Sequence, residues 1–148
     1  MASVLRCSHL NRALAFRSYM QGFTKKIQSS QDLMLKLKHD LERLKSDPND
    51  VYAAFDFFVT AEHISEWNGD KKIRREHELL KAVSHLANSA KHFQVRDKRH
   101  NTVTKLTTRF SEPDIDGICV AYNGNEVSAL SLAEEVVKFW ASKLWVQG

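Results

Sequence analysis

Three polar side chains near the end of a predicted helix could carry out chemistry together. Asn88, Lys91 and His92 are spaced i, i+3 and i+4, so a helix places them on one side. We expect His92 to act as a general acid or base, Lys91 to contact a phosphate and Asn88 to orient the substrate. Such a group suits cleavage of RNA. The alternative interpretation is structural: a histidine near the negative end of a helix dipole, beside a solvated lysine.

A second set of polar residues lies on the preceding predicted helix, at steps of four and three. We expect the site in the cleft between the two helices. Its walls are Asp56, Thr60 and His63 on one side, and Asn88, Lys91 and His92 on the other. Antiparallel helices joined by a short loop bring Asp56 nearer His92 than His63 is, and a carboxylate there would raise the histidine pKa. His63 is expected to have a different partner, such as Glu66 or a backbone group of the hairpin.

A basic stretch follows directly on this candidate site. Six Lys or Arg residues occur between Lys91 and Arg109, and Asp97 is the single acidic residue among them. Clustered cations are what a phosphodiester backbone requires. The members assigned to backbone binding are Arg96, Lys98 and Arg99. The alternative is a solvated basic loop, because runs of charge are usually solvated.

The chain lacks the common motifs of metal and nucleotide chemistry. It has no CxxC, HExxH, GxSxG, P-loop or Rossmann glycine pattern. His63 and His92 with Glu62 are a weak set of metal ligands, so we predict neither a metal nor a cofactor. The aromatic residues are explained by helical periodicity and are expected in the core rather than as stacking platforms. They are Phe55, Phe57, Phe58, Trp67, Trp140 and Trp145.

Composition predicts a soluble globular protein. The 148 residues correspond to one domain, and 43% hydrophobic with 27% charged residues is ordinary for this class. A net charge of +4 and a pI near 9.1 fit a polyanionic partner such as RNA. Two distant cysteines indicate a reduced compartment. No apolar run approaches the roughly 18 residues of a membrane span, and no secretory signal is evident, so we expect a cytoplasmic protein without membrane contact.

The elements that must position the site are mainly helices. Residues 1–28 are predicted to be a loosely ordered lead-in, with a short helix near residues 12–20, and residues 29–148 a single helical-bundle domain. A first helix begins after Ser29 and ends before Pro48. A second spans about Asp50 to Trp67, with Gly69 as its C′ residue, and a third about Lys71 to Phe93. The inward face of the second helix is predicted to include Val51, Ala54, Phe58, Ala61 and Ile64.

A β-hairpin is expected before the last helix. Residues 118–122 and 126–128 are β-prone, and Asn123-Gly124 between them is the strongest short hairpin signal. Ser131 with Glu134 forms a predicted capping box that opens a helix reaching Trp145. The predicted fold is therefore all-α, an antiparallel helical bundle with one small β-hairpin before the last helix.

Two segments also resemble known proteins. They run from Phe57 to Trp67 and from Leu86 to Phe93, and the closing helix around Glu134–Trp140 is similar too. Together they resemble a family of small helical proteins from bacteria and phages, and more distantly the HEPN superfamily of RNA-cleaving toxins and phage-defence nucleases. This resemblance implies a metal-independent endoribonuclease, RNA as ligand, a homodimer and a protein partner such as an antitoxin.

The chain departs from the HEPN pattern at one position. HEPN nucleases place an arginine before the catalytic histidine with four to six residues between the two, and no suitable arginine precedes His92. Asn88 and His92 match the remaining part of the pattern. The alternative function is therefore a non-enzymatic protein-interaction module, for instance an accessory protein of a phage or mobile element.

Overall fold

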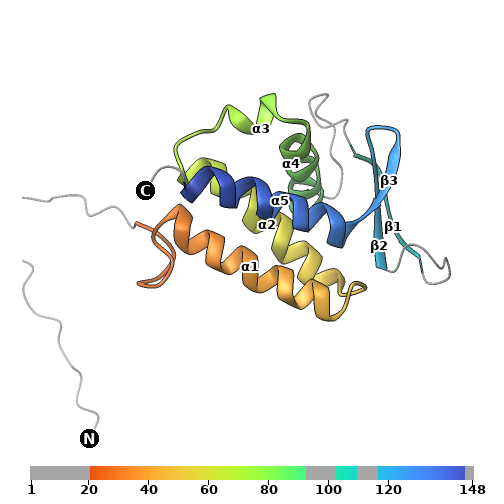
Figure 1. The fold of residues 1–148 in the computed structure, drawn as a ribbon, viewed down its shortest axis with the longest axis horizontal. Coiled ribbons are helices and arrows are strands. Elements are labelled where there is room, and N and C mark those ends of the chain that lie inside the picture. Colours follow the sequence, from red (N-terminus) through yellow and green to blue (C-terminus); the bar gives the residue numbers. More distant parts are fainter. Residues whose placement is uncertain (1–20, 93–102, 110–116, 146–148) are drawn as a thin grey trace, which may run out of the picture.

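The chain folds into helices with a small antiparallel sheet at one end (Figure 1). The structure is a computed structural model that describes residues 21–92, 103–109 and 117–145. Its elements, in chain order, are α1 (Ser30–Ser46), α2 (Val51–Trp67), α3 (Ile73–Glu76), α4 (Glu78–Lys91), β1 (Val103–Arg109), β2 (Gly117–Tyr122), β3 (Asn125–Ser128) and α5 (Ala129–Trp145). The predicted helix near residues 12–20 lies outside the described residues.

Helix α1 begins at a capping box, as its sequence indicates. The hydroxyl of Ser29 accepts a hydrogen bond from the Asp32 N–H, and the Asp32 carboxylate accepts one from the Ser29 N–H. These bonds satisfy donors that a helix N-terminus leaves free. Leu37 and Leu44 are fully buried, so the predicted leucine stripe faces the core.

Helix α2 lies at the centre of the helical part and packs against α1, α4 and α5. The Asp50 side chain caps its N-terminus, and Gly69 follows its C-cap with φ of 78°, as predicted. Three aromatic or aliphatic assignments were wrong. Val51, Phe55 and Trp67 are 56%, 50% and 37% exposed, whereas Ala53, which was not predicted inward, is buried, and Phe57 is buried as predicted.

The predicted third helix is two helices. His77 has an extended backbone, φ −105° and ψ 123°, which separates the short α3 from α4. The His77 ring lies 4.6 Å from the Phe139 ring of α5, centroid to centroid. This tertiary contact holds the break in place, and the periodicity of residues 71–93 does not encode it.

The sheet contains the predicted hairpin and one further strand. Strand β2 pairs antiparallel with β3 across Asn123-Gly124, whose φ angles of 51° and 75° are both positive, as a tight hairpin turn requires. Strand β1 pairs antiparallel with the other edge of β2, giving the order β1-β2-β3. A single hairpin buries little, and the third strand widens the sheet.

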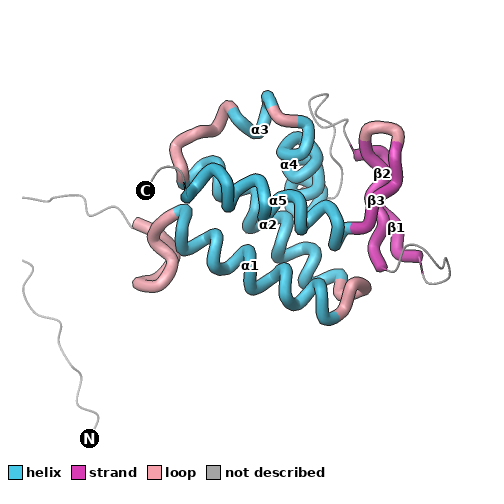
Figure 2. Tube along the Cα trace, viewed as in Figure 1, coloured by secondary structure: helices cyan, strands magenta, loops and turns pink. Residues whose placement is uncertain are grey.

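Helix α5 returns from the sheet across the other helices (Figure 2). It begins at Ala129, earlier than predicted, because the Ser128 hydroxyl rather than that of Ser131 caps it by accepting the Ser131 N–H at 3.0 Å. Trp140 is buried in the core, as expected. The described part of the chain is thus mostly helical, with the antiparallel hairpin immediately before the last helix.

Candidate functional site

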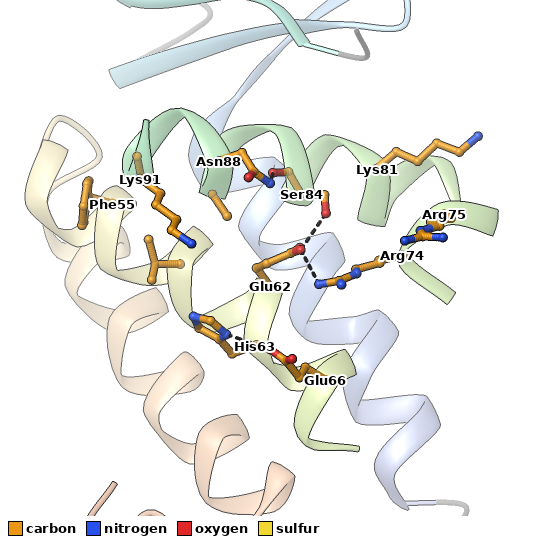
Figure 3. Close-up of a pocket in the computed structure, with 13 residues that line it drawn as sticks. Phe55, Glu62, His63, Glu66, Arg74, Arg75, Lys81, Ser84, Asn88 and Lys91 are labelled. Atoms are coloured by element: carbon orange, nitrogen blue, oxygen red, sulfur yellow. Dashed lines mark hydrogen bonds and ion pairs between the residues drawn. The ribbon is translucent and has the colours of Figure 1, made fainter. Parts of the chain in front are cut away.

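A groove of about 840 Å³ lies between α2, α3 and α4. The α2 side of this groove consists of Phe55, Val59, Glu62, His63 and Glu66. These residues are four, three, one and three positions apart, so they share one face of the helix. The opposite side carries Arg74 and Arg75 from α3, with Lys81, Ser84, Asn88 and Lys91 from α4 (Figure 3).

Glu62 connects the three helices that form the groove. Its Oε1 accepts hydrogen bonds from Arg74 Nη1 at 2.8 Å and from the Ser84 hydroxyl at 2.7 Å. The side chains of Glu62 and Arg74 are 13% and 24% exposed. A largely buried carboxylate needs such partners, and a charge-assisted pair supplies them. Glu62 therefore holds α3 and α4 against α2.

Glu66 forms a second ionic pair at the mouth of the groove. Its Oε1 lies 3.1 Å from Lys71 Nζ, and its Oε2 lies 3.6 Å from His63 Nδ1. The hydrogen bond with Lys71 is the main reason that the pKa of Glu66 lies below its usual value, and His63 adds to this effect. The expected pairing of His63 with Glu66 is therefore present.

The groove has an excess of positive charge. Four Lys or Arg residues and two glutamates line it. Glu62 is neutralised by Arg74, Glu66 by Lys71, and Lys81 pairs with Glu78. Within residues 21–92, no ion pair engages Arg75 or Lys91. Lys91 extends into the groove towards His63 (Figure 3).

Asp56 and Thr60 do not lie on the expected wall. Asp56 Oδ2 is 2.7 Å from Arg43 Nη1, and the Thr60 hydroxyl, which is buried, accepts a hydrogen bond from Lys36 Nζ at 2.9 Å. Both cations belong to α1, so these two side chains face α1 and not α4. Of the three residues predicted on α2, His63 alone lines the groove.

Of the three site residues predicted near the end of α4, only two lie in the groove. Asn88 and Lys91 line the groove, but the Asn88 amide donates to the Ser84 carbonyl oxygen at 2.8 Å. His92 is the exposed C-cap of α4 and is not among the side chains that line the groove. The predicted basic residues Arg96, Lys98 and Arg99 lie outside the described residues.

Buried polar contacts between α1 and α2 explain where Asp56 points. Asp40 is 2% exposed and pairs with Lys36 and Arg43. Arg43 also reaches Asp50 and Asp56, and the hydrogen bond with Asp56 is the main cause that raises the pKa of Arg43. Because a buried carboxylate must be paired, Lys36 and Arg43 lie beside Asp40 at this interface. Asp56 points to the same interface because it pairs with Arg43.

Sequence reasoning did not assign several groove residues to the site, namely Phe55, Arg74, Arg75 and Ser84. A signal for the α2 members was present. Phe55, Val59, Glu62 and Glu66 repeat at steps of four, three and four, the same spacing as the stripe from Asp56 to Trp67. The two stripes differ by one residue, about 100° around the helix.

None of the family models, curated proteins or solved structures compared with the chain matches it. In the described part of the chain, no group of three or more His, Cys, Asp or Glu residues could hold a metal ion. Among the same residues, no helix is both long and apolar enough to cross a bilayer.

Proposed function

We propose that the groove between α2, α3 and α4 binds the phosphate backbone of RNA. The observation that supports this proposal is which charged side chains of the groove have a partner of opposite charge and which do not. Both carboxylates of the groove are engaged by cations of this chain, whereas Lys91 and Arg75 have no acidic partner among the described residues. An anionic ligand would satisfy them, and the sequence that follows α4 is also rich in Lys and Arg.

Binding is better supported than cleavage. A phosphodiesterase needs a general acid or base within hydrogen-bond reach of the attacked hydroxyl. His92 does not line the groove, and Asn88 is engaged by a backbone carbonyl. His63 is the histidine of the groove, so cleavage, if RNA is cut, would depend on His63 rather than His92. The HEPN resemblance, which implies RNA as the ligand, supports the same substrate class.

The binding test uses charge reversal at one groove residue. In Lys91→Glu, the affinity for a labelled RNA hairpin should fall about tenfold, and the slope of log K against log salt should decrease by roughly one, because one phosphate contact is lost. Fluorescence anisotropy between about 50 and 200 mM salt measures both quantities. Gel analysis of the same RNA, with His63→Ala and His92→Ala, reports any cleavage.

Lys138→Glu is the matched control. Lys138 is an exposed lysine on α5, which contributes nothing to the groove, and its reversal changes the net charge by the same amount. If both variants lose affinity equally, binding follows net charge alone and the groove is not the site. If the native protein does not bind RNA at all, the proposal is wrong.

A protein-interaction module is the second candidate. It is favoured by the apolar start of α2, where Val51, Tyr52 and Phe55 are 56%, 81% and 50% exposed on neighbouring positions. Exposed apolar patches commonly mark protein contacts. Absence of RNA binding, together with a homodimer or a tight complex with a protein partner in solution, would support this function instead.

A further inference from the structure

Phe55 is an aromatic residue of the groove that the fold does not use for its core. Phe57 and Phe58, two and three positions later, are buried, and their rings pack edge to face with centroids 5.3 Å apart. Phe55 is 50% exposed and lines the groove together with Lys91. Both side chains lie at the same end of the groove, away from Arg74 and Arg75 (Figure 3).

An exposed aromatic ring beside a lysine that pairs with no acidic residue of the described ranges is the combination that single-stranded nucleic acids need. Unpaired bases stack on aromatic side chains, and cations track the adjoining backbone. In a duplex the bases are already stacked on one another and present no free face. The volume of about 840 Å³ also lies in the range of pockets for drug-sized ligands, which corresponds to a few nucleotides rather than a helical turn.

We infer that the groove accepts a single-stranded segment of RNA, in which one base stacks on Phe55 while Lys91 contacts a neighbouring phosphate. This inference rests on the proposed function and specifies its substrate class. Phe55 is then a specificity-determining residue, because it distinguishes unpaired from paired nucleotides. Arg75, at the other end of the groove from Phe55 and Lys91, is placed to contact a phosphate farther along the strand.

Phe55→Ala tests the inference. The affinity for a labelled single-stranded octanucleotide should fall roughly tenfold, because stacking of one base is lost. Binding of the same sequence as a duplex should be weaker in the native protein and unchanged in the variant. Phe55→Trp should restore the affinity for the single strand, and its fluorescence should change on binding.

Tyr52→Ala provides the control. Tyr52 is 81% exposed, lies on the same helix one turn earlier and does not line the groove, so its removal should leave both affinities unchanged. Because both aromatic side chains are at least half exposed, circular dichroism should show the native fold in each variant.

The outcomes separate this inference from the proposed function. Loss of affinity in Lys91→Glu without any loss in Phe55→Ala would leave RNA binding in place and overturn the stacking role. Duplex bound as tightly as single strand would also overturn it. If neither variant changes affinity, both the inference and the groove as the RNA site are wrong.

Discussion

Glu62 has two roles that oppose each other. Through Arg74 and the Ser84 hydroxyl it holds α3 and α4 in place, and its negative charge reduces the attraction of the groove for an anion. Stability and ligand affinity therefore place opposite demands on this carboxylate. A protein selected only for binding anions would not keep a glutamate here, but a protein that must also hold three helices together has a reason to.

Replacing Glu62 by Gln should separate the two roles. The amide loses the ion pair with Arg74, so the free energy of unfolding should fall by about 1.5–3 kcal/mol, the usual contribution of a charge-assisted hydrogen bond. At the same time RNA affinity should rise about threefold, since a unit charge about 6 Å away in water contributes about 0.7 kcal/mol. Urea denaturation and fluorescence anisotropy measure these effects.

Glu66→Gln is the matched control for this variant. It removes the same charge from the same groove, but Glu66 is 43% exposed and holds no second helix. RNA affinity should rise by a similar factor, with little change in stability. A fall in affinity for both variants would mean that the carboxylates contact the ligand, and the assigned roles would then be wrong.

The residues of the site could be predicted only in part, for a physical reason visible in α2. Periodicity identifies polar stripes, and His63 from the predicted stripe lines the groove, next to Glu66, which was one of the partners expected for it. Two stripes one residue apart have the same spacing, and which of them faces the groove depends on α1. Lys36 and Arg43 bind Thr60 and Asp56, and this fixes the rotation of α2. The rotation of α2 therefore depends on contacts with another helix, and the sequence of α2 alone does not reveal it.

At the scale of elements, local signals worked where the structure depends on local contacts. The helix start after Ser29, the C′ position of Gly69 and the turn at Asn123-Gly124 each depend on neighbouring residues, and each is present. One local signal failed at α5, where Ser128 rather than the predicted Ser131 caps the helix. Another failure involves a distant contact. At the break, the His77 ring contacts Phe139, more than sixty positions away, and the periodicity of the third helix contains no sign of this contact.

The capping box of α1 gives a prediction of pH dependence. Backbone N–H of Gln28, followed by the Ser29 hydroxyl, lowers the pKa of Asp32 below its usual 3.8. Since the folded-state pKa is the lower one, the Asp32 charge stabilises the protein above this usual value, and the contribution is lost as pH falls through the lowered pKa. Asp32→Asn should therefore lower the urea midpoint at pH 7, and the difference from the native protein should vanish in strong acid.

Glu135→Gln serves as the comparison for Asp32. Glu135 is an exposed glutamate in the middle of α5, away from any helix terminus, so its replacement should leave the urea midpoint nearly unchanged at every pH. A difference between Asp32→Asn and the native protein that persists at low pH would show that the carboxylate charge is not what stabilises the start of α1.

At the scale of the whole molecule, α2 separates two ionic regions of different kind. On its α1 side, Asp40, Asp50 and Asp56 are satisfied by Lys36 and Arg43 within the chain. On its α4 side, cations exceed carboxylates among the groove residues, and Arg75 and Lys91 have no acidic partner in the described part of the chain. The first region fixes the rotation of α2, and this rotation presents Phe55 and His63 to the second. Helix packing on one side of α2 thus determines the ligand surface on the other.

A close backbone contact between the sheet and the α1–α2 connection gives the last prediction. Gly117, the first residue of β2, has φ of +106°, and the Ile118 N–H donates to the Pro48 carbonyl oxygen in the α1–α2 connection at 3.4 Å. A Cβ on Gly117 would lie 2.4 Å from that oxygen. Alanine there must both adopt a strained φ and push the sheet away from the helices.

Gly124→Ala isolates the two effects, because Gly124 also has a positive φ, +75°, but no atom lies within 4 Å of its Cβ position. Gly124→Ala should lower the free energy of unfolding by about 1–2 kcal/mol, from backbone strain alone. Gly117→Ala should lower it by about 3 kcal/mol or more, because overpacking against Pro48 adds to the strain. Urea denaturation followed by circular dichroism measures both. Equal losses would mean that the contact with Pro48 does not hold the sheet. A larger loss for Gly117→Ala, with RNA affinity unchanged in the folded variant, would show that the sheet stabilises the helices without forming the groove.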